Sequence, residues 1–111
     1  MSGGPPYPYT VVYDADALHD FNEEVRSRAE RLAVANAVDK LRRLGEQLVP
    51  PHMKPLKGYG ELRESRPRQG RSPTRPLYRR FGDSYVVLAI AVKDDFEKKA
   101  SRAQERARQY D

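Results

Sequence analysis

Basic side chains are concentrated in one third of this 111-residue chain, between Pro51 and Phe81. The segment has nine lysines and arginines against two glutamates, a net charge of about +7, which leaves about −2 for the rest of a chain whose total is +5. The nine are Lys54, Lys57, Arg63, Arg66, Arg68, Arg71, Arg75, Arg79 and Arg80. Lysine and arginine side chains that bind a phosphate backbone release the counterions held around it, and this release favours binding. The segment therefore predicts a nucleic-acid partner. The alternative is a solvated face without a ligand, as most charge runs are.

Most of these cations are arginines, whose planar guanidinium binds phosphate with two donors and stacks on bases. Tyr59 and Tyr78 lie among them and could offer surfaces for base stacking. Cleavage of RNA at a 2′-hydroxyl needs a base, an acid and cations that stabilise the pentacoordinate phosphate. A lysine whose pKa is lowered by neighbouring cations can act as the base, so crowding of Lys54, Lys57 and Lys93 with the arginines would suit this reaction.

Other chemistries have less support in the sequence. His19 and His52 belong to different predicted elements, so no metal site is expected. The chain has no cysteine, which excludes disulfides, thiolate catalysis and Cys-ligated zinc. No serine has a nucleophile signature such as Gly-x-Ser-x-Gly. The glycines at 58 and 60 lack the Gly-Lys-Ser/Thr and the helix of a phosphate-binding loop, so they predict only a turn.

Length and composition predict one small domain with a charged surface. The chain is 38% hydrophobic and contains no apolar window long enough to cross a membrane. Its first residues lack the pattern of a secretion signal, so a cytoplasmic protein is expected. Residues 1–8 are rich in Gly and Pro and predict a flexible arm, whereas residues 9–111 form the domain.

The first half of the domain predicts a strand and two helices. Residues 9–13 are β-branched and aromatic, which is typical of a strand. Asp14 and Asp16 can cap a helix, and apolar residues then recur at helical spacing as far as Leu48. One helix of this length would be too long for so small a domain, so we expect a break at residues 31–36. Pro50 and Pro51 would end the second helix.

The second half predicts three strands and a helix. Strands are expected at residues 61–65 and 76–81, followed by a turn at Gly82 and an apolar central strand at 85–92. Residues 96–110 have a thin apolar stripe and predict a marginal helix with few contacts. The expected fold is α+β, a mainly antiparallel sheet of about four strands with two N-terminal helices on one face. The opposite face would then be an open concavity that displays Arg63, Arg75 and either Arg79 or Arg80.

The segment from Leu41 to Lys93 resembles the RelE/ParE superfamily of type II toxins and, within it, the phage-derived HigB-like branch. The resemblance rests on Glu61-Leu62-Arg63, on Arg75-Pro76-Leu77-Tyr78 and on the apolar strand that ends at Lys93. Residues before these motifs also match, namely Leu44, Gly45, Leu48, Pro51, Lys54, Leu56 and Gly60. The predicted order of elements agrees with that family as well.

This resemblance implies an mRNA-cleaving toxin that often acts on the ribosome and that a helix-turn-helix antitoxin neutralises. It implies no metal or organic cofactor. Arg63, Arg75 and Lys93 lie at matching catalytic positions, and Lys54 is a catalytic candidate at a position whose spacing varies in the family. The remaining candidates would bind RNA: Lys57, Arg66, Arg68, Tyr78, Arg79, Arg80 and Tyr110.

One departure from the family pattern keeps a second function open. Asp94 stands where many members have another basic residue, so it would either transfer a proton or impair cleavage. The alternative is therefore a gyrase-inhibiting toxin of the ParE type, or a relative that binds nucleic acid without cleaving it. An antitoxin partner is expected in either case, because an uncovered basic face would bind RNA indiscriminately.

Overall fold

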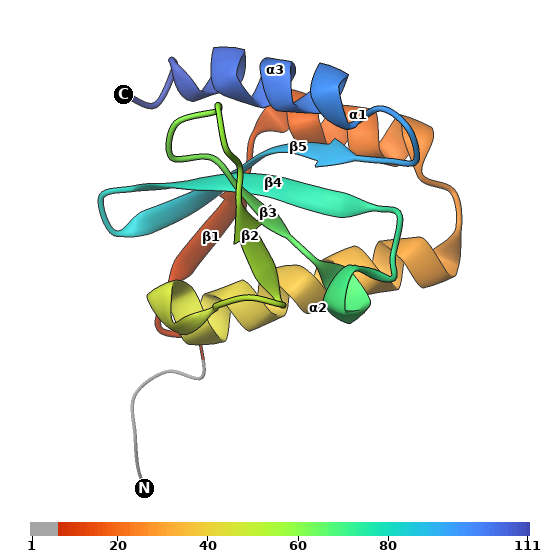
Figure 1. Cartoon of the computed structure of the whole chain (residues 1–111), viewed down its shortest axis with the longest axis horizontal. Coiled ribbons are helices and arrows are strands. Elements are labelled where there is room, and N and C mark those ends of the chain that lie inside the picture. Colours follow the sequence, from red (N-terminus) through yellow and green to blue (C-terminus); the bar gives the residue numbers. More distant parts are fainter. Residues whose placement is uncertain (1–6) are drawn as a thin grey trace, which may run out of the picture.

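A single mixed sheet organises the chain in the computed structural model, which describes residues 7–111 (Figure 1). The strands are β1 (Thr10–Tyr13), β2 (Met53–Pro55), β3 (Arg63–Ser65), β4 (Arg75–Phe81) and β5 (Ser84–Ala91). The α-helices are α1 (Ala15–Glu24), α2 (Arg28–Leu44) and α3 (Phe96–Ala107), and the short 3-10 helices are η1 (Gly45–Gln47) and η2 (Pro67–Gly70). Most of the expected N-terminal arm lies outside the described residues, so it stays a prediction.

The strand order is β1-β5-β4-β3-β2, with β1 parallel to β5 and every other pair antiparallel. The α+β class and the tight β4–β5 turn at Gly82 are confirmed. One detail of the prediction is wrong, because the middle strand is β4, with β1 added outside the apolar β5. The sheet has five strands within residues 7–111, one more than the sequence indicated, because short β2 has too few residues to show an alternating pattern.

The break between the N-terminal helices occurs at residues 25–27, earlier than the predicted 31–36. Val25 is extended, and the Ser27 side chain accepts a hydrogen bond from the Glu30 amide to start α2. Apolar spacing continues across this cap, which is why periodicity alone misplaced it. The predicted end of α2 at Pro50 is also wrong, because Gly45 ends the helix with a φ of 53°.

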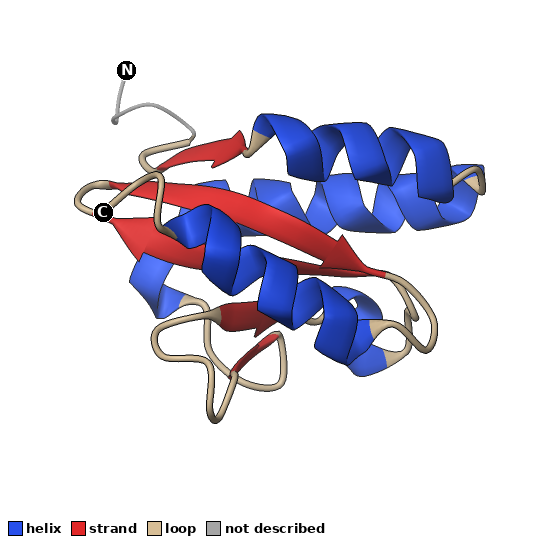
Figure 2. Ribbon diagram, turned by 90° about the horizontal axis from the view of Figure 1, so that it is seen from above, coloured by secondary structure: helices blue, strands red, loops and turns tan. Residues whose placement is uncertain are grey.

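Helices cover both faces of the sheet. Side chains of α1 and α2, such as Phe21 and Leu41, pack with Tyr85 on one face, as predicted for the two N-terminal helices. On the other face, α3 buries Ala100 and Ala103 against the sheet, and Figures 1 and 2 show it lying across the long strands. The predictions of an open face and of a marginal C-terminal helix are therefore wrong.

None of the helices within residues 7–111 combines the length and the apolar character that a membrane crossing requires.

Candidate functional site

The basic residues of the central strands are divided between the two faces of the sheet. Neighbouring residues of a strand point to opposite faces, so Arg63 faces α2 while Glu64 faces the side of α3. In β4, Arg75 and Arg79 share the α3 side with Leu77, whereas Arg80 points to the α2 side with Tyr78. Because Arg63 pairs with Tyr78, it lies on the opposite face from Arg75. As a result, the predicted arginines do not lie together on one surface.

Four charged residues gather on the α3 side near the β2 edge, and we call them the Arg75 cluster: Lys54, Glu64, Arg66 and Arg75. Strand register places exposed Lys54 opposite Glu64. The buried Glu64 carboxylate lies 3.5 Å from Arg75 Nη1 and 3.9 Å from Arg66 Nε, both through its Oε1 atom. The cluster has a net charge of +2 and includes two of the predicted catalytic residues, Lys54 and Arg75.

The Arg75 guanidinium is fixed by the loop before β4. Its Nε donates to the Ser72 carbonyl at 3.2 Å, and its Nη2 donates to the Gly70 carbonyl at 2.9 Å. Arg66 Nε is buried and has no hydrogen-bond partner among residues 7–111. Arg75 is thus held in position, whereas the neighbouring Arg66 has an N–H donor that no protein group among these residues accepts.

Arg63, the third predicted catalytic residue, belongs to a separate polar network on the α2 side. It donates two hydrogen bonds to the Glu46 carboxylate, at 2.7 and 3.1 Å, and the Tyr85 hydroxyl donates a third at 2.6 Å. Arg80 lies 3.9 Å from the same carboxylate. The hydrogen bonds from Arg63, followed by that from Tyr85, lower the pKa of Glu46 to about 2. Glu46 therefore stays ionised and neutralises part of the predicted basic face.

The tyrosines predicted to contact RNA are held by the protein in this structure. Tyr78 is buried, which raises the pKa of its hydroxyl to about 12, and its ring is covered by the core. Its hydroxyl has no hydrogen-bond partner within the described chain. Tyr110 packs on Phe81 and donates its hydroxyl hydrogen to Asp14 at 2.8 Å. Tyr78 therefore presents no free face for base stacking, whereas 38% of Tyr110 is exposed, so its role in RNA binding stays a prediction.

The other predicted residues are dispersed. Arg79 is on the α3 side, where it lies 2.9 Å from Asp111 and stacks over Phe81. Lys57 is exposed in the loop between β2 and β3, and Arg68 is exposed in η2. Lys93, the fourth predicted catalytic residue, lines a shallow groove with residues of the α1–α2 link.

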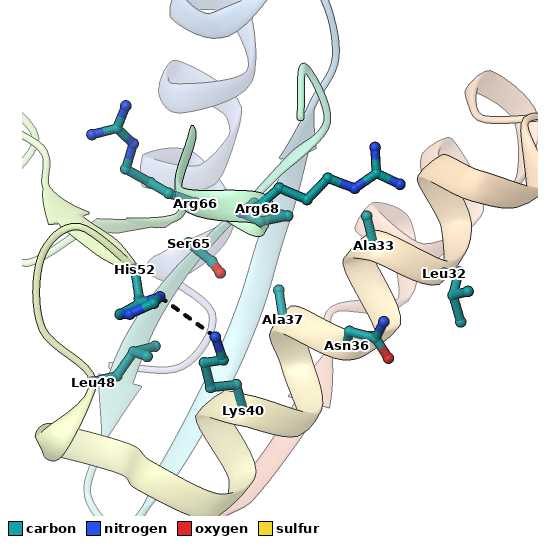
Figure 3. Close-up of a pocket in the computed structure, with 11 residues that line it drawn as sticks. Leu32, Ala33, Asn36, Ala37, Lys40, Leu48, His52, Ser65, Arg66 and Arg68 are labelled. Carbon is teal, nitrogen blue, oxygen red and sulfur yellow. Dashed lines mark hydrogen bonds between the residues drawn. The ribbon is translucent and has the colours of Figure 1, made fainter. Parts of the chain in front are cut away.

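A second cationic surface lies between α2 and η2, on the side of the sheet away from Glu64 (Figure 3). It is a groove of about 240 Å³. Its lining comprises Leu32, Ala33, Asn36, Ala37, Lys40, Leu48, His52, Ser65, Arg66, Pro67 and Arg68. No carboxylate is among these residues, so the groove is positively charged.

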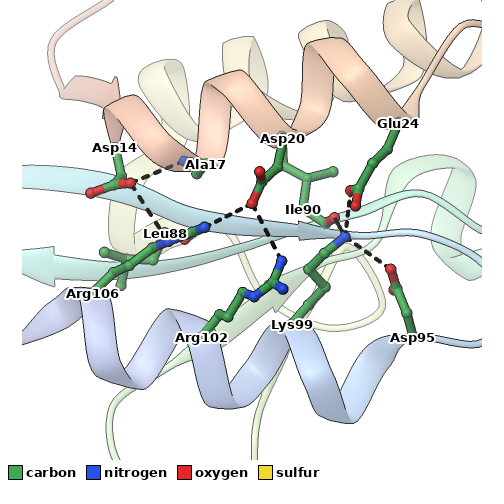
Figure 4. Close-up of polar contacts among 10 residues, drawn as sticks. All are labelled: Asp14, Ala17, Asp20, Glu24, Leu88, Ile90, Asp95, Lys99, Arg102 and Arg106. Carbon is green, nitrogen blue, oxygen red and sulfur yellow. Dashed lines mark hydrogen bonds and ion pairs between the residues drawn. The ribbon is translucent and has the colours of Figure 1, made fainter.

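Elsewhere, basic residues of α3 are paired with acids of α1 (Figure 4). Arg106 donates to Asp20 at 2.7 Å and to the Leu88 carbonyl at 2.9 Å. The ammonium of Lys99 donates to Glu24, Asp95 and the Ile90 carbonyl. Because these cations are paired within the protein, they are not available to a ligand. The Arg75 cluster and the groove are therefore the candidate sites. No group of three or more potential metal-ligating side chains occurs among residues 7–111.

Sequence reasoning missed Glu64 and Glu46, the two acids that organise these arginines. Glu64 was counted only as a charge within the basic segment, and Glu46 was not singled out. The alternation Arg63-Glu64-Ser65 could have placed Arg63 and Glu64 on opposite faces, but the burial of Glu64 depends on its neighbours in other strands.

No protein-family model matches the chain, and no curated protein sequence matches it. Among solved structures, it is similar to a double arginine-to-alanine mutant of the E. coli toxin RelE in the free state, with a TM-score of 0.66. The match covers 89% of this chain and 97% of that one, at 18% sequence identity. The chain therefore has a RelE-like fold. This confirms the fold class expected from the sequence, while the HigB-like branch remains a prediction.

Proposed function

We propose that the protein is a metal-independent endoribonuclease, the toxin of a type II toxin–antitoxin system, which cleaves mRNA at the Arg75 cluster. The observation that carries this proposal is Glu64, a buried carboxylate held between two arginines and beside a lysine on a RelE-like sheet. Base, acid and phosphate-binding cations are the groups that RNA cleavage requires. The RelE-like fold also supports an antitoxin partner and the ribosome as the place of cleavage, with a helix-turn-helix protein as the expected antitoxin.

The residues of the Arg75 cluster have distinct roles in this proposal. The 2′-hydroxyl oxygen attacks the adjacent phosphorus, and its proton passes to the Glu64 carboxylate. Arg75 and Arg66 hold the phosphate oxygens as negative charge develops, which charge-assisted hydrogen bonds favour. The ammonium of Lys54 protonates the departing 5′ oxygen. The products are a 2′,3′-cyclic phosphate and a 5′-hydroxyl.

The sharpest test is Glu64→Gln, because this change keeps the shape of the side chain while it removes the base and its charge. We expect cleavage to fall at least about 100-fold, the usual contribution of a general base. The measurement is primer extension on a cellular mRNA after induced expression. Glu61→Gln is the matched control, since Glu61 is exposed three residues away and should keep full activity.

Arg75→Ala should also abolish cleavage, but Arg75 fixes the loop through Gly70 and Ser72, so its thermal stability must be measured in parallel. Arg75→Lys keeps a positive charge without the two-donor geometry and should retain only a small part of the activity. Full activity of a folded Glu64→Gln variant would refute the assigned base, and full activity of Arg75→Ala would refute the site.

A non-ribonuclease function is favoured by one observation, the pairing of Arg63, Arg79 and Arg80 with internal acids. Less free positive charge is then available for RNA than the sequence suggested. A gyrase-inhibiting toxin would arrest growth with intact mRNA, broken DNA and an induced damage response. A binding protein without catalysis would leave both nucleic acids intact.

A further inference from the structure

We infer that the groove between α2 and η2 is a binding site for a nucleoside monophosphate, either free or as one nucleotide of an RNA strand. The groove lies on the α2 side of the sheet, whereas the Arg75 cluster lies on the α3 side, and Arg66 is the one residue that belongs to both. The inference therefore does not depend on RNA cleavage and can be tested apart from it.

Cations at two places in the groove could hold the phosphate. On one side, Lys40 Nζ lies 3.4 Å from His52 Nδ1 (Figure 3). On the other side, the Arg68 guanidinium extends toward α2 near Ala33. Neither Lys40 nor Arg68 forms an ion pair with a carboxylate among residues 7–111, whereas most arginines of the strands do. An anion in the groove would therefore meet donors that no acid occupies.

A neutral donor lies between these cations. Ser65 is 4% exposed, its hydroxyl is directed into the groove, and it makes no hydrogen bond within the described part of the chain. Arg66 also lines the groove, but its guanidinium points away from Lys40, and its Nε lies 3.9 Å from Glu64 Oε1. The Ser65 hydroxyl is not among the buried polar atoms of residues 7–111 that lack a partner, so it is open to the groove and can donate to a phosphate or ribose oxygen.

The rest of the lining is apolar and suits one base. Ala33, Ala37, Leu48 and Pro67 form the buried part of the wall. The volume of about 240 Å³ is below the roughly 300–1,000 Å³ of sites for drug-sized ligands. A single nucleotide with its ribose partly in solvent is therefore the size of ligand that fits.

The loop that carries Arg68 has an unusual backbone and is anchored to α2. Arg68 and Gln69 have φ values of 56° and 58°, a region that residues with side chains seldom adopt. Glu30 of α2 accepts hydrogen bonds from Thr74 Oγ1 at 2.7 Å and Ser72 Oγ at 3.2 Å, just beyond that loop. Such strain is maintained only where surrounding contacts enforce it and is common at ligand sites. The fold thus holds the backbone of Arg68 beside the groove before any ligand binds.

The experiment is a titration of the ¹⁵N-labelled full chain with AMP, inorganic phosphate and a five-nucleotide single-stranded RNA, followed by NMR. AMP should shift the amide signals of Ala37, Lys40 and Ser65 in a saturable way. Lys40→Gln and Arg68→Gln should each weaken binding about tenfold, as expected for loss of a charge-assisted hydrogen bond. Ala37→Leu keeps every charge but fills the groove and should abolish the shifts.

Arg43→Gln is the matched control, because Arg43 is an exposed cation of α2 outside the groove, and it should leave binding unchanged. Binding of RNA alone, weakened by the same variants, would support the site and assign it to a nucleotide within a strand. Phosphate that binds as tightly as AMP would overturn the role of the apolar wall. Absence of saturable shifts, or binding that Arg68→Gln leaves intact, would overturn the site, whatever the result of Glu64→Gln in the cleavage assay.

Discussion

Lys99 is a buried cation with 1% of its side chain exposed, and its ammonium has an acceptor for each of its three hydrogens. Burial of a charge is costly unless such partners are present. Its contacts with Glu24 at 2.6 Å and Asp95 at 2.9 Å explain why a lysine is tolerated against the core. The C-terminal helix, which was predicted to have few contacts, is held here by charge as well as by its alanines.

Replacement of this lysine by an apolar side chain of similar length is therefore predicted to destabilise the fold. Lys99→Met leaves Glu24 and Asp95 without their cation and the Ile90 carbonyl without its donor. The free energy of unfolding should fall by about 2–3 kcal/mol, less than for fully buried acids, because both carboxylates are partly exposed. Urea denaturation measures the change. Lys98→Met, at the exposed neighbouring position, should change it by less than about 0.5 kcal/mol, and equal stabilities of the two variants would contradict the prediction.

The ionised carboxylate of Glu46 is expected to contribute stability that is lost at low pH. The pKa of its carboxyl is lowered from an ordinary 4.5 to about 2, chiefly by the hydrogen bonds from Arg63. A lowered pKa in the folded protein contributes stability that is complete above pH 4.5 and is lost as the pH falls toward 2. We expect the Glu46 carboxyl signal in an NMR titration to have a midpoint near 2, and Arg63→Gln should move it up toward 4.5. A midpoint near 4 in the unchanged protein would contradict this account.

At the scale of elements, the end of α2 depends on a glycine in close contact with an aromatic ring. Gly45 has a φ of 53°, and a Cβ placed there would be 2.6 Å from Cζ of Tyr9. The turn therefore both ends the helix and allows the segment before β1 to pack against it. A side chain at this position would force the ring or the backbone to move.

Gly45→Ala should lower the free energy of unfolding by about 2–4 kcal/mol, of which about 1 kcal/mol arises from the positive φ and the rest from the clash. Gly82→Ala is the matched control. Gly82 has a φ of 60° but open space around it, so only the backbone contribution of about 1 kcal/mol is expected. Thermal or urea unfolding of both variants measures the difference, and equal losses would show that contact with Tyr9 is unimportant.

Elements with a strong local signal could be predicted from the sequence, and those defined by distant partners could not. The apolar run of β5 and the glycine turn before it were found because strand and turn preferences coincide there. The break at Ser27 was misplaced because its cap interrupts a regular apolar pattern. The docking of α3 was missed because its partners, Asp20 and Glu24, are far away in the sequence.

The same distinction applies to the candidate site. Lys54 and Arg75 were predicted from residue type and motif, but Glu64 was not, since its place beside them follows from strand register and burial. Arg63 was grouped with Arg75, but it pairs with Tyr78, three residues further along β4, and an odd separation along a strand puts the two arginines on opposite faces. The groove at Lys40 and Arg68 joins two segments that no local pattern connects.

At the scale of the whole molecule, the Asp20–Arg106 ion pair joins the N-terminal and C-terminal helices. Only 13% of the Arg106 side chain is exposed, so solvent and salt screen this pair weakly. A double-mutant cycle with Asp20→Asn and Arg106→Gln should give a coupling free energy of about 1–2 kcal/mol that persists at high salt.

The comparison pair for that cycle is Asp39–Arg42, one turn apart on α2 with 44% and 33% of the side chains exposed. Its coupling should be about 0.2–0.5 kcal/mol and should vanish in salt. Similar coupling free energies in the two cycles would show that the Asp20–Arg106 contact stabilises the fold no more than a surface ion pair does.

The parallel pairing of β1 with β5 constrains the order in which the molecule can be assembled during translation. Thr10 pairs with Ser84, so the first strand has no partner until most of the sequence has been made. Until then the apolar sides of α1 and α2 remain uncovered, as surfaces that chaperones bind and that aggregate readily. A truncated product that stops before β5 would lack that protection, and quality control could remove it before it acquires any activity.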